Sequence, residues 1–235
     1  MRILAMDLKT TSVDPDTCMP IELGVVLWDT ARKTPLEMLN LMVSIEGDLS
    51  PEITEVTGIL AADLREFGVS EEIAKALYCK MARRADMIIG HNVLKFDRPV
   101  MNRWCEGNPQ YQRGQHWIDS RYDVPYPESI KTRKLTYLMA EHGMLNPFAH
   151  RAVFDALSCC LLLARYDLND VLEASRSPFV RVEAQVSYRD RQKAKDAGFF
   201  WDADNKAWYL EGRALVLDKL TNCWDFNVNR KVLCE

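Results

Sequence analysis

Short apolar runs separated by polar turns dominate the first part of the chain. Residues 2–6, 21–28 and 36–45 are each rich in aliphatic side chains, which predicts three strands that follow one another as an antiparallel meander. Asp7 directly follows the first run. We therefore expect its carboxylate at the carboxyl end of a strand.

Helical spacing becomes prominent after residue 50. Ser50-Pro51 is typical of a helix start, and Ser70 is placed to cap a helix over residues 69–84. A buried strand over residues 86–89 is then expected to lead into His91. Further helices are expected over residues 96–104, 133–142 and 151–166. A strand meander followed by alternating strands and helices predicts an α/β fold, a mixed sheet flanked by helices.

A polar stretch that ends at Pro178 predicts a domain boundary. We expect a first domain over residues 1–174 and a small β/α domain over residues 178–235. The second is predicted to contain strands over 179–186 and 208–210 and helices over 188–197 and 213–220, with Gly198 ending the first helix.

Composition narrows the class of protein. The 235 residues are 48% hydrophobic, so a sizeable core is expected. The formal net charge of −4 means that any nucleic-acid surface must be a local basic patch. The seven cysteines and their spacing favour a reducing compartment. The longest apolar run, 156–164, falls short of the ~20 residues of a membrane span, so no membrane association and a cytoplasmic location are expected.

Four polar residues are candidates for metal-dependent chemistry. Asp7 follows a strand, Asp97 begins a predicted helix, and Asp155 lies in the first turns of another. Carboxylates are the hard oxygen ligands that two-metal phosphodiester hydrolysis requires, and His150 has the pKa range of a general base. Alone, each aspartate is more often a turn or cap residue, and a loop histidine is more often a surface residue. Their combination favours a nuclease site.

The motifs around these residues carry a family resemblance. They read Asp7-Leu8-Lys9-Thr10-Thr11, then His91-Asn92 with Phe96-Asp97, then His150-x-Ala152-x-x-Asp155. In this order they resemble the DEDDh family of 3′→5′ exonucleases, which share the RNase H-like fold and include proofreading subunits of bacterial replicative polymerases. The resemblance covers residues 1–168 and implies a phage or bacterial DNA-processing protein.

The resemblance implies a role for each matching residue. Asp7, Asp97 and Asp155 would bind two Mg²⁺ or Mn²⁺ ions, and His150 would be the general base. The residues expected to contact the 3′-terminal nucleotide are Leu8, Thr10, Asn92 and Phe96. Core packing is an equal alternative for Leu8 and Phe96. The implied partners are DNA 3′ ends and a polymerase or other replication protein.

Lys9 departs from the family pattern, which has a metal-binding glutamate at this position. A protonated amine cannot donate an electron pair to a metal ion, and it repels one. Three interpretations are open: Lys9 silences the nuclease, or it extends outward and leaves a weak single-metal or Mn²⁺-dependent activity, or its ammonium replaces a cation and contacts phosphate.

The sequence therefore predicts a metal-dependent 3′→5′ exonuclease that acts on DNA 3′ ends and is impaired or abolished by Lys9. The alternative is a catalytically inactive nucleic-acid-binding or polymerase-associated protein with the same fold. One of the two metal ions is expected to be lost with Lys9. DNA against RNA stays open.

The C-terminal segment has a resemblance of its own. Residues 194–202 and 206–209 are similar to small modules of phage and plasmid DNA-processing proteins. Trp201 and Trp208 could stack on bases, but a small domain also needs large side chains for its core. The basic stretch 189–195 is a candidate nucleic-acid face, with an ordinary solvated face as the equal alternative.

Overall fold

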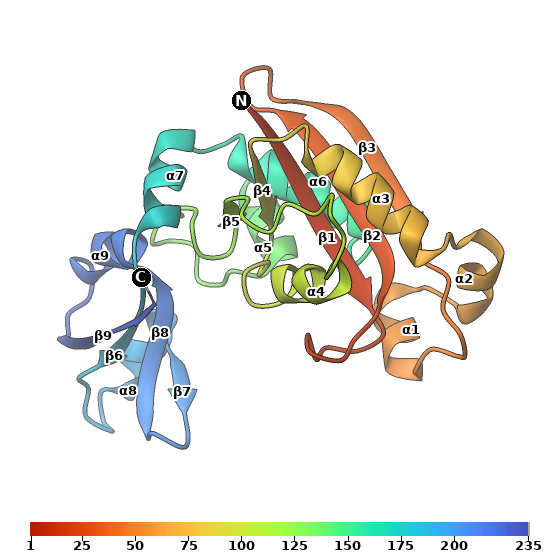
Figure 1. Cartoon of the computed structure of the whole chain (residues 1–235). Coiled ribbons are helices and arrows are strands. Elements are labelled where there is room, and N and C mark those ends of the chain that lie inside the picture. The colour runs from red at the N-terminus through yellow and green to blue at the C-terminus, as the bar shows by residue number, and fades with distance from the viewer. Residues whose placement is uncertain (235) are drawn as a thin grey trace.

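The computed structural model describes residues 1–234 and contains two units, each built on its own sheet. Figure 1 shows the larger, N-terminal unit beside a smaller C-terminal one. The larger sheet has five strands in the order β3-β2-β1-β4-β5, and the smaller has four in the order β7-β8-β6-β9.

The large sheet is mixed. Its strands β1, β2 and β3 pair antiparallel, whereas β4 pairs parallel with both β1 and β5. The strands are β1 (Arg2–Thr10), β2 (Pro20–Asp29), β3 (Thr34–Met42), β4 (Met87–Gly90) and β5 (Trp117–Asp119). The helices are α1 (Pro51–Thr57), α2 (Ala61–Phe67), α3 (Glu71–Ala82), α4 (Asp97–Trp104), α5 (Leu135–Glu141), α6 (Ala152–Leu163) and α7 (Leu168–Arg176).

Helices cover both faces of this sheet, so β1 is buried on both sides. Side chains alternate between faces along a strand. Leu4 and Met6 pack in the cluster that contains residues of α3 and α4. Ile3 and Ala5 pack in the cluster that contains residues of α5, α6 and α7. The odd-numbered positions of β1 therefore face α6.

The C-terminal unit consists of an antiparallel sheet and two helices. Its elements are β6 (Phe179–Ala184), α8 (Arg191–Asp196), β7 (Phe200–Asp202), β8 (Ala207–Arg213), α9 (Ala214–Thr221) and β9 (Val228–Cys234). Val180, Phe199 and Leu217 are buried at its centre, and Trp208 packs against them. Trp201 is 52% exposed and lies 5.5 Å from Trp208, ring centre to ring centre. Of the two candidate tryptophans, Trp208 is half-buried against the core and Trp201 is exposed.

The fold class predicted from the sequence is confirmed, with corrections in detail. The first strand continues to Thr10, so Asp7 lies inside β1 and not at its end. The parallel pairing with β4, however, stops at Ala5, two residues before Asp7. The chain passes from the first unit to the second between α7 and β6, and the domain limits 1–174 and 178–235 stay a prediction. No helix within residues 1–234 has the length and apolar character needed to cross a membrane.

Candidate active site

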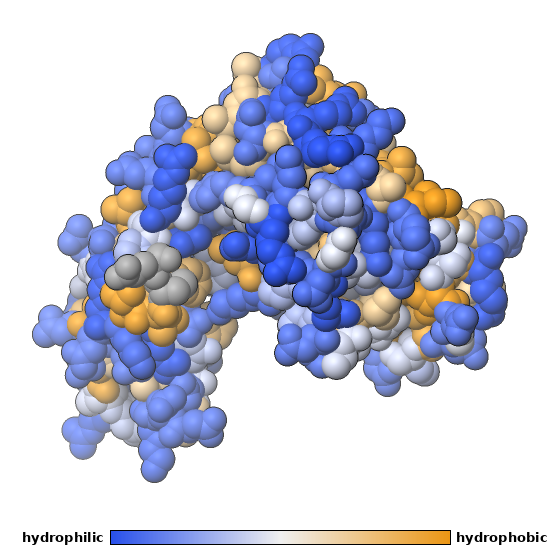
Figure 2. All heavy atoms as spheres, in the orientation of Figure 1, coloured by the Kyte–Doolittle hydropathy of each residue, from blue (hydrophilic) through white to orange (hydrophobic). Residues whose placement is uncertain are grey.

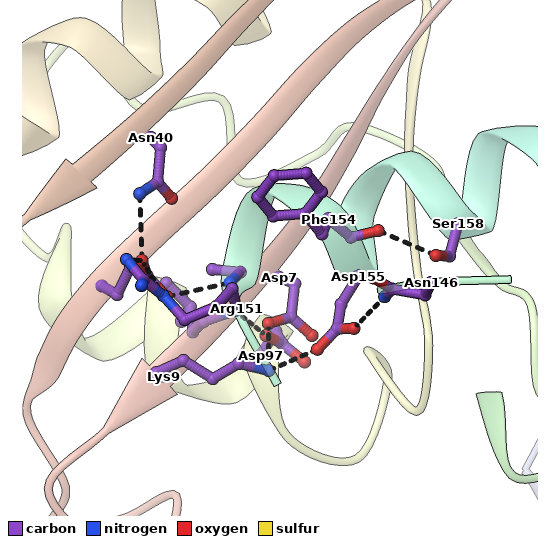
Figure 3. Close-up of polar contacts among 12 residues, drawn as sticks. Asp7, Lys9, Asn40, Asp97, Asn146, Arg151, Phe154, Asp155 and Ser158 are labelled. Atoms are coloured by element: carbon purple, nitrogen blue, oxygen red, sulfur yellow. Dashed lines mark hydrogen bonds and ion pairs between the residues drawn. The ribbon is translucent and has the colours of Figure 1, made fainter. Parts of the chain in front are cut away.

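Strand β1 directs Asp7 and Lys9 toward helix α6. Residues two apart on a strand lie on the same face, and the odd-numbered face of β1 is the one that α6 covers. Asp155, in the first turn of α6, lies opposite them. Figure 3 shows the three side chains converging from the strand and the helix. Strand alternation thus explains why Lys9 points into the site and not toward solvent.

The Lys9 ammonium bridges two of the predicted metal ligands. Its Nζ donates a hydrogen bond to Asp155 Oδ2 at 2.7 Å and lies 2.8 Å from Asp7 Oδ2. The Lys9 side chain is only 12% exposed. The interpretation in which Lys9 extends outward is therefore wrong for this structure, because two carboxylates hold the ammonium inside.

Asp97 closes the site from the opposite side of β1. It is the first residue of α4 and is buried, and its Oδ1 accepts a hydrogen bond from the backbone N–H of Leu8 at 2.9 Å. This bond ties the start of α4 to the strand between Asp7 and Lys9. The structure therefore brings Asp7, Lys9, Asp97 and Asp155 together.

Burial and mutual repulsion determine the charge of the site. Burial raises the pKa of Asp7 to about 6, although Lys9 opposes the shift and Asp155 adds to it. Burial, reinforced by Asp7, raises the pKa of Asp97 well above its usual range. Burial disfavours the Lys9 ammonium, but Asp7 and Asp155 outweigh that effect and raise its pKa. Lys9 thus stays charged beside Asp7 and Asp97, two carboxyl groups whose ionisation burial disfavours.

The N-terminus of α6 is fixed on β2 by a close approach and by an ion pair. Gly24 pairs with Asp7 across the sheet, and a Cβ at Gly24 would lie 2.1 Å from Val153 N. Beside it, the buried Glu22 accepts hydrogen bonds from Arg151 Nη2 at 2.6 Å and from Ala152 N at 2.9 Å. These contacts determine where Asp155 lies relative to β1.

The predicted general base lies on the loop that enters α6. His150 is exposed, has a left-handed backbone with φ of 68°, and forms no hydrogen bond within residues 1–234. The same loop reaches the site through Asn146, whose Nδ2 donates to Asp155 Oδ1 at 2.9 Å. Within residues 1–234, Asn146 is thus the side chain of this loop that forms a hydrogen bond with the acidic cluster, and His150 forms none.

The four residues expected at the terminal nucleotide differ in accessibility. Leu8 and Thr10 are buried, and Thr10 Oγ1 donates to the carbonyl of Ser12 at 2.6 Å. Asn92 and Phe96 are half-buried on the segment between β4 and α4. Asn92 adopts φ of 63°, and its N–H donates to the buried Asp119 at 2.9 Å.

The donor set does not fit a two-metal centre in this arrangement. Asp7 and Asp155 face an ammonium, which already neutralises part of the charge a divalent ion would require. Across the described 234 residues, no three His, Cys, Asp or Glu side chains are arranged to hold a metal ion. The predicted ligands Asp7, Asp97 and Asp155 are close together, but Lys9 lies where they would meet a cation.

Several supporting residues escaped the sequence prediction. Glu22 had a usable signal, because an acidic residue inside the apolar run 21–28 requires a buried partner. Asn146 and Asp119 had none, since both lie in segments without periodicity. Asp119 accepts bonds from the N–H groups of Asn92, Leu94 and Arg121 and so shapes the loop before α4.

Two family models match the chain. A model described as Exonuclease, of the RNase T type, matches residues 4–163, the part that contains all the residues of the site. A second, for a domain of unknown function, matches residues 180–210 of the C-terminal unit. The curated protein sequences give no match.

Solved structures resemble the fold. E. coli exonuclease I in complex with a dT13 oligonucleotide has a TM-score of 0.65 at 17% identity, over 83% of this chain and 50% of its own. An exonuclease I complex with SSB-Ct has a TM-score of 0.61 at 16% identity, over the same shares. A 3′-exonuclease that recognises the histone mRNA stem-loop has a TM-score of 0.55 at 19% identity, over 70% of this chain and 80% of its own. This chain spans about half the length of exonuclease I.

Proposed function

This chain belongs to the exonuclease family whose model it matches over residues 4–163, and from that premise we propose that it holds DNA 3′ ends without cutting them. The observation that carries the proposal is the Lys9 bridge, 2.8 Å from Asp7 and 2.7 Å from Asp155. The exonuclease fold supports binding of a strand end, whereas the Lys9 ammonium lies between two carboxylates that would otherwise be free to bind a metal ion.

Electrostatics support the loss of cutting. At about 4 Å and an effective dielectric near 20, two unit charges interact by roughly 4 kcal/mol, and a divalent ion about doubles that repulsion from Lys9. Asp155 also uses both carboxylate oxygens, one on Lys9 and one on Asn146. A metal ion would therefore have to displace two existing contacts as well as overcome the repulsion.

Recognition of the strand end falls to the groups around this cluster. Asn92 and Phe96 are accessible in part and are proposed to contact the terminal nucleotide through the amide and the ring. Leu8 and Thr10 are buried, so we propose that they contact the terminal nucleotide only through backbone groups and the small exposed part of each side chain. Single-stranded DNA is the proposed ligand, and the dT13 complex of exonuclease I supports it.

A weak exonuclease is the second candidate function. It is favoured by the presence of Asp7, Asp97, Asp155 and His150 in the family positions. In this alternative, Asp7, Asp97 and Asp155 would hold Mg²⁺ or Mn²⁺ once the Lys9 ammonium has moved away from them, and His150 would move from its exposed position toward the site as general base. A replication protein is the proposed partner in either case, and the SSB-Ct complex of exonuclease I supports that class.

The two candidates are separated by cleavage of a 5′-labelled single-stranded oligonucleotide with Mg²⁺ and with Mn²⁺. We expect no shortening by the unaltered chain and a 3′-shortened ladder from Lys9→Glu, because a carboxylate at this position removes the ammonium and adds a ligand. The double variant Lys9→Glu/Asp155→Asn is the control and should lose the ladder. Cutting by the unaltered chain that Asp155→Asn abolishes would establish the second candidate and refute the first.

A further inference from the structure

A cavity of about 180 Å³ lies between the two units of the molecule. Its N-terminal wall carries four cationic residues, Lys95, Arg121, Lys131 and Arg133. The acidic residues that line it are Glu128 and Glu211, and Glu211 is paired with Lys95 at 2.8 Å. Figure 2 shows the two units joined at one end and separated by a notch at the other, with mostly hydrophilic side chains along its border.

Two arginines in this cavity have unused hydrogen-bond donors. Arg121 Nε and Arg133 Nη1 are buried and have no hydrogen-bond partner within residues 1–234. Neither guanidinium forms an ion pair with any described carboxylate of that range. Arginine stays protonated in proteins, so these donors cannot be removed by titration. Buried donors without a partner are rare and call for one.

The surrounding structure fixes both side chains in place. The Arg133 guanidinium lies 4.6 Å from the ring centre of Tyr126. The backbone carbonyl of Arg133 accepts a hydrogen bond from His91 Nε2 at 2.8 Å. The Arg121 guanidinium lies 5.5 Å from the ring centre of Tyr122. Burial lowers the pKa of Arg133, and the nearby Arg121 acts in the same direction. Two like charges thus line the same cavity, and neither is paired with a carboxylate of residues 1–234.

We propose that Arg121 and Arg133 form a phosphate-binding site in the cavity between the two units. The planar fork of a guanidinium matches the oxygens of a phosphate group, and two of them match its charge. A backbone phosphate of a bound strand and a free phosphate ion share this chemistry. That the phosphate belongs to a bound DNA strand rests on the proposed function, whereas binding of a free phosphate ion does not.

The position of the site favours a strand. Arg121 N–H and Asn92 N–H donate to the same carboxylate oxygen of Asp119, each at 2.9 Å. The Asp119 carboxylate therefore links the cavity wall, through two hydrogen bonds, to the segment that carries Asn92 and Phe96. Phe200, Tyr209 and Trp224 line the cavity from the C-terminal unit and offer rings for base stacking.

The test compares the unaltered chain with Arg121→Gln/Arg133→Gln, and with Arg83→Gln as a matched control on the exposed end of α3. A fluorescent dT oligonucleotide is titrated without divalent metal at several KCl concentrations, and inorganic phosphate is titrated separately by calorimetry. We expect the double variant to bind the oligonucleotide at least about tenfold more weakly, with a log–log salt slope smaller by about 1 or more. The control should match the unaltered chain.

Each outcome decides the inference. If the unaltered chain binds phosphate and only the double variant loses this binding, the result supports the site. If the oligonucleotide does not bind in that case, the proposed function is refuted and the phosphate site is not. Equal binding of both ligands by variant and unaltered chain overturns the inference and leaves the proposed function standing, and absence of binding of either ligand overturns both. If circular dichroism shows that the double variant is unfolded, Arg121→Lys/Arg133→Lys replaces it. This variant keeps both charges but loses the planar fork of the guanidinium, so we expect it to bind phosphate more weakly. Unchanged phosphate binding by this variant would overturn the inference.

Discussion

A single side chain decides the chemistry of the acidic cluster. Asp7, Asp97 and Asp155 are drawn together on both sides of β1, where burial, and after it mutual repulsion, disfavours the charged carboxylates of Asp7 and Asp97. Lys9 supplies a cation from within the strand. The positive charge beside these carboxylates therefore comes from the chain itself.

Removing the ammonium should destabilise the protein in a pH-dependent way. We expect Lys9→Met to lower the free energy of unfolding by about 3 kcal/mol or more at pH 7, because buried carboxylates are left without a partner. Asp7, with a pKa raised to about 6, already contributes stability that is lost as the pH rises from about 4 through 6. Without Lys9 its pKa rises further, so the deficit should be largest at pH 7 to 8 and shrink toward pH 5.

Urea denaturation at pH 5, 6, 7 and 8 measures this deficit. Lys193→Met is the matched control, because Lys193 also pairs with an aspartate at 2.8 Å but at the surface. Its effect should stay below about 1 kcal/mol at every pH. A Lys9→Met deficit that does not change with pH would show that the carboxylates are not what Lys9 stabilises.

The residues that converge on Lys9 could largely be anticipated, whereas their supports could not. Spaced motifs point to Asp7, Asp97 and Asp155, which the sequence pattern places after an apolar run, at the start of a helix and in the first turns of another. The inward direction of Lys9 follows from its being two residues after Asp7 in a strand that extends past residue 6, which the apolar pattern alone did not indicate. Asn146 lies in a loop, and no periodicity predicts what a loop side chain contacts.

At the scale of elements, the position of α6 on β2 determines the geometry of the site. The backbone of Val153 packs against Gly24 at a distance that leaves no room for a Cβ, and Arg151 is held by Glu22 two residues along the same strand. These two contacts fix the position of α6 relative to β2, both along the strand and perpendicular to the sheet. Asp155 is one turn further along α6 and inherits this placement.

Gly24→Ala should disrupt that contact. The new Cβ would meet backbone atoms of α6 at 2.1 to 2.5 Å, and backbone cannot turn away as a flexible side chain can. We expect a loss of about 3 kcal/mol in unfolding free energy by urea denaturation. Gly114→Ala is the control, because no atom of residues 1–234 other than its chain neighbours lies within 4 Å of its Cβ position and its φ is not positive. It should change stability by less than about 0.5 kcal/mol, and equal effects from the two would contradict this account of the contact.

Sequence patterns predicted most of the elements and missed α2, α7, β5, β7 and β9. Strands β1 to β3 and helices α3, α4 and α6 have apolar runs or apolar periodicity over eight or more residues, and β4 is a short buried apolar run. Strand β5 spans only Trp117–Asp119, too short for any period to register. Strand β9 consists of Val228–Cys234, where charged and apolar residues do not alternate with burial because this strand is largely exposed.

At the scale of the whole molecule, the two units are joined by a buried ion pair. Arg213, at the end of β8, donates to Asp123 Oδ1 at 2.7 Å, and Asp123 is fully buried in the N-terminal unit. Tyr122 packs edge-on against Phe179 beside it. Asp123 also accepts the N–H of Asp119, so the joint continues to the residue that holds the loop before α4.

Arg213→Met should uncouple the units. The loss leaves Asp123 buried without its guanidinium, and we expect about 3 kcal/mol less stability together with a separate, earlier transition for the C-terminal unit in scanning calorimetry. Arg230→Met is the control, because Arg230 pairs with Asp218 at the surface and within one unit. A single cooperative transition in Arg213→Met, unchanged in shape, would mean that the units do not depend on this pair.

The Lys9 bridge also makes the arrangement of the acidic cluster independent of metal ions in solution. An ion delivered by solution leaves when a chelator competes for it, whereas Lys9 is tethered two residues from Asp7, and its effective concentration is set by the strand. The cluster therefore keeps its shape in media stripped of divalent ions, where a metal-dependent relative of the same fold would lose the cation that holds its carboxylates together.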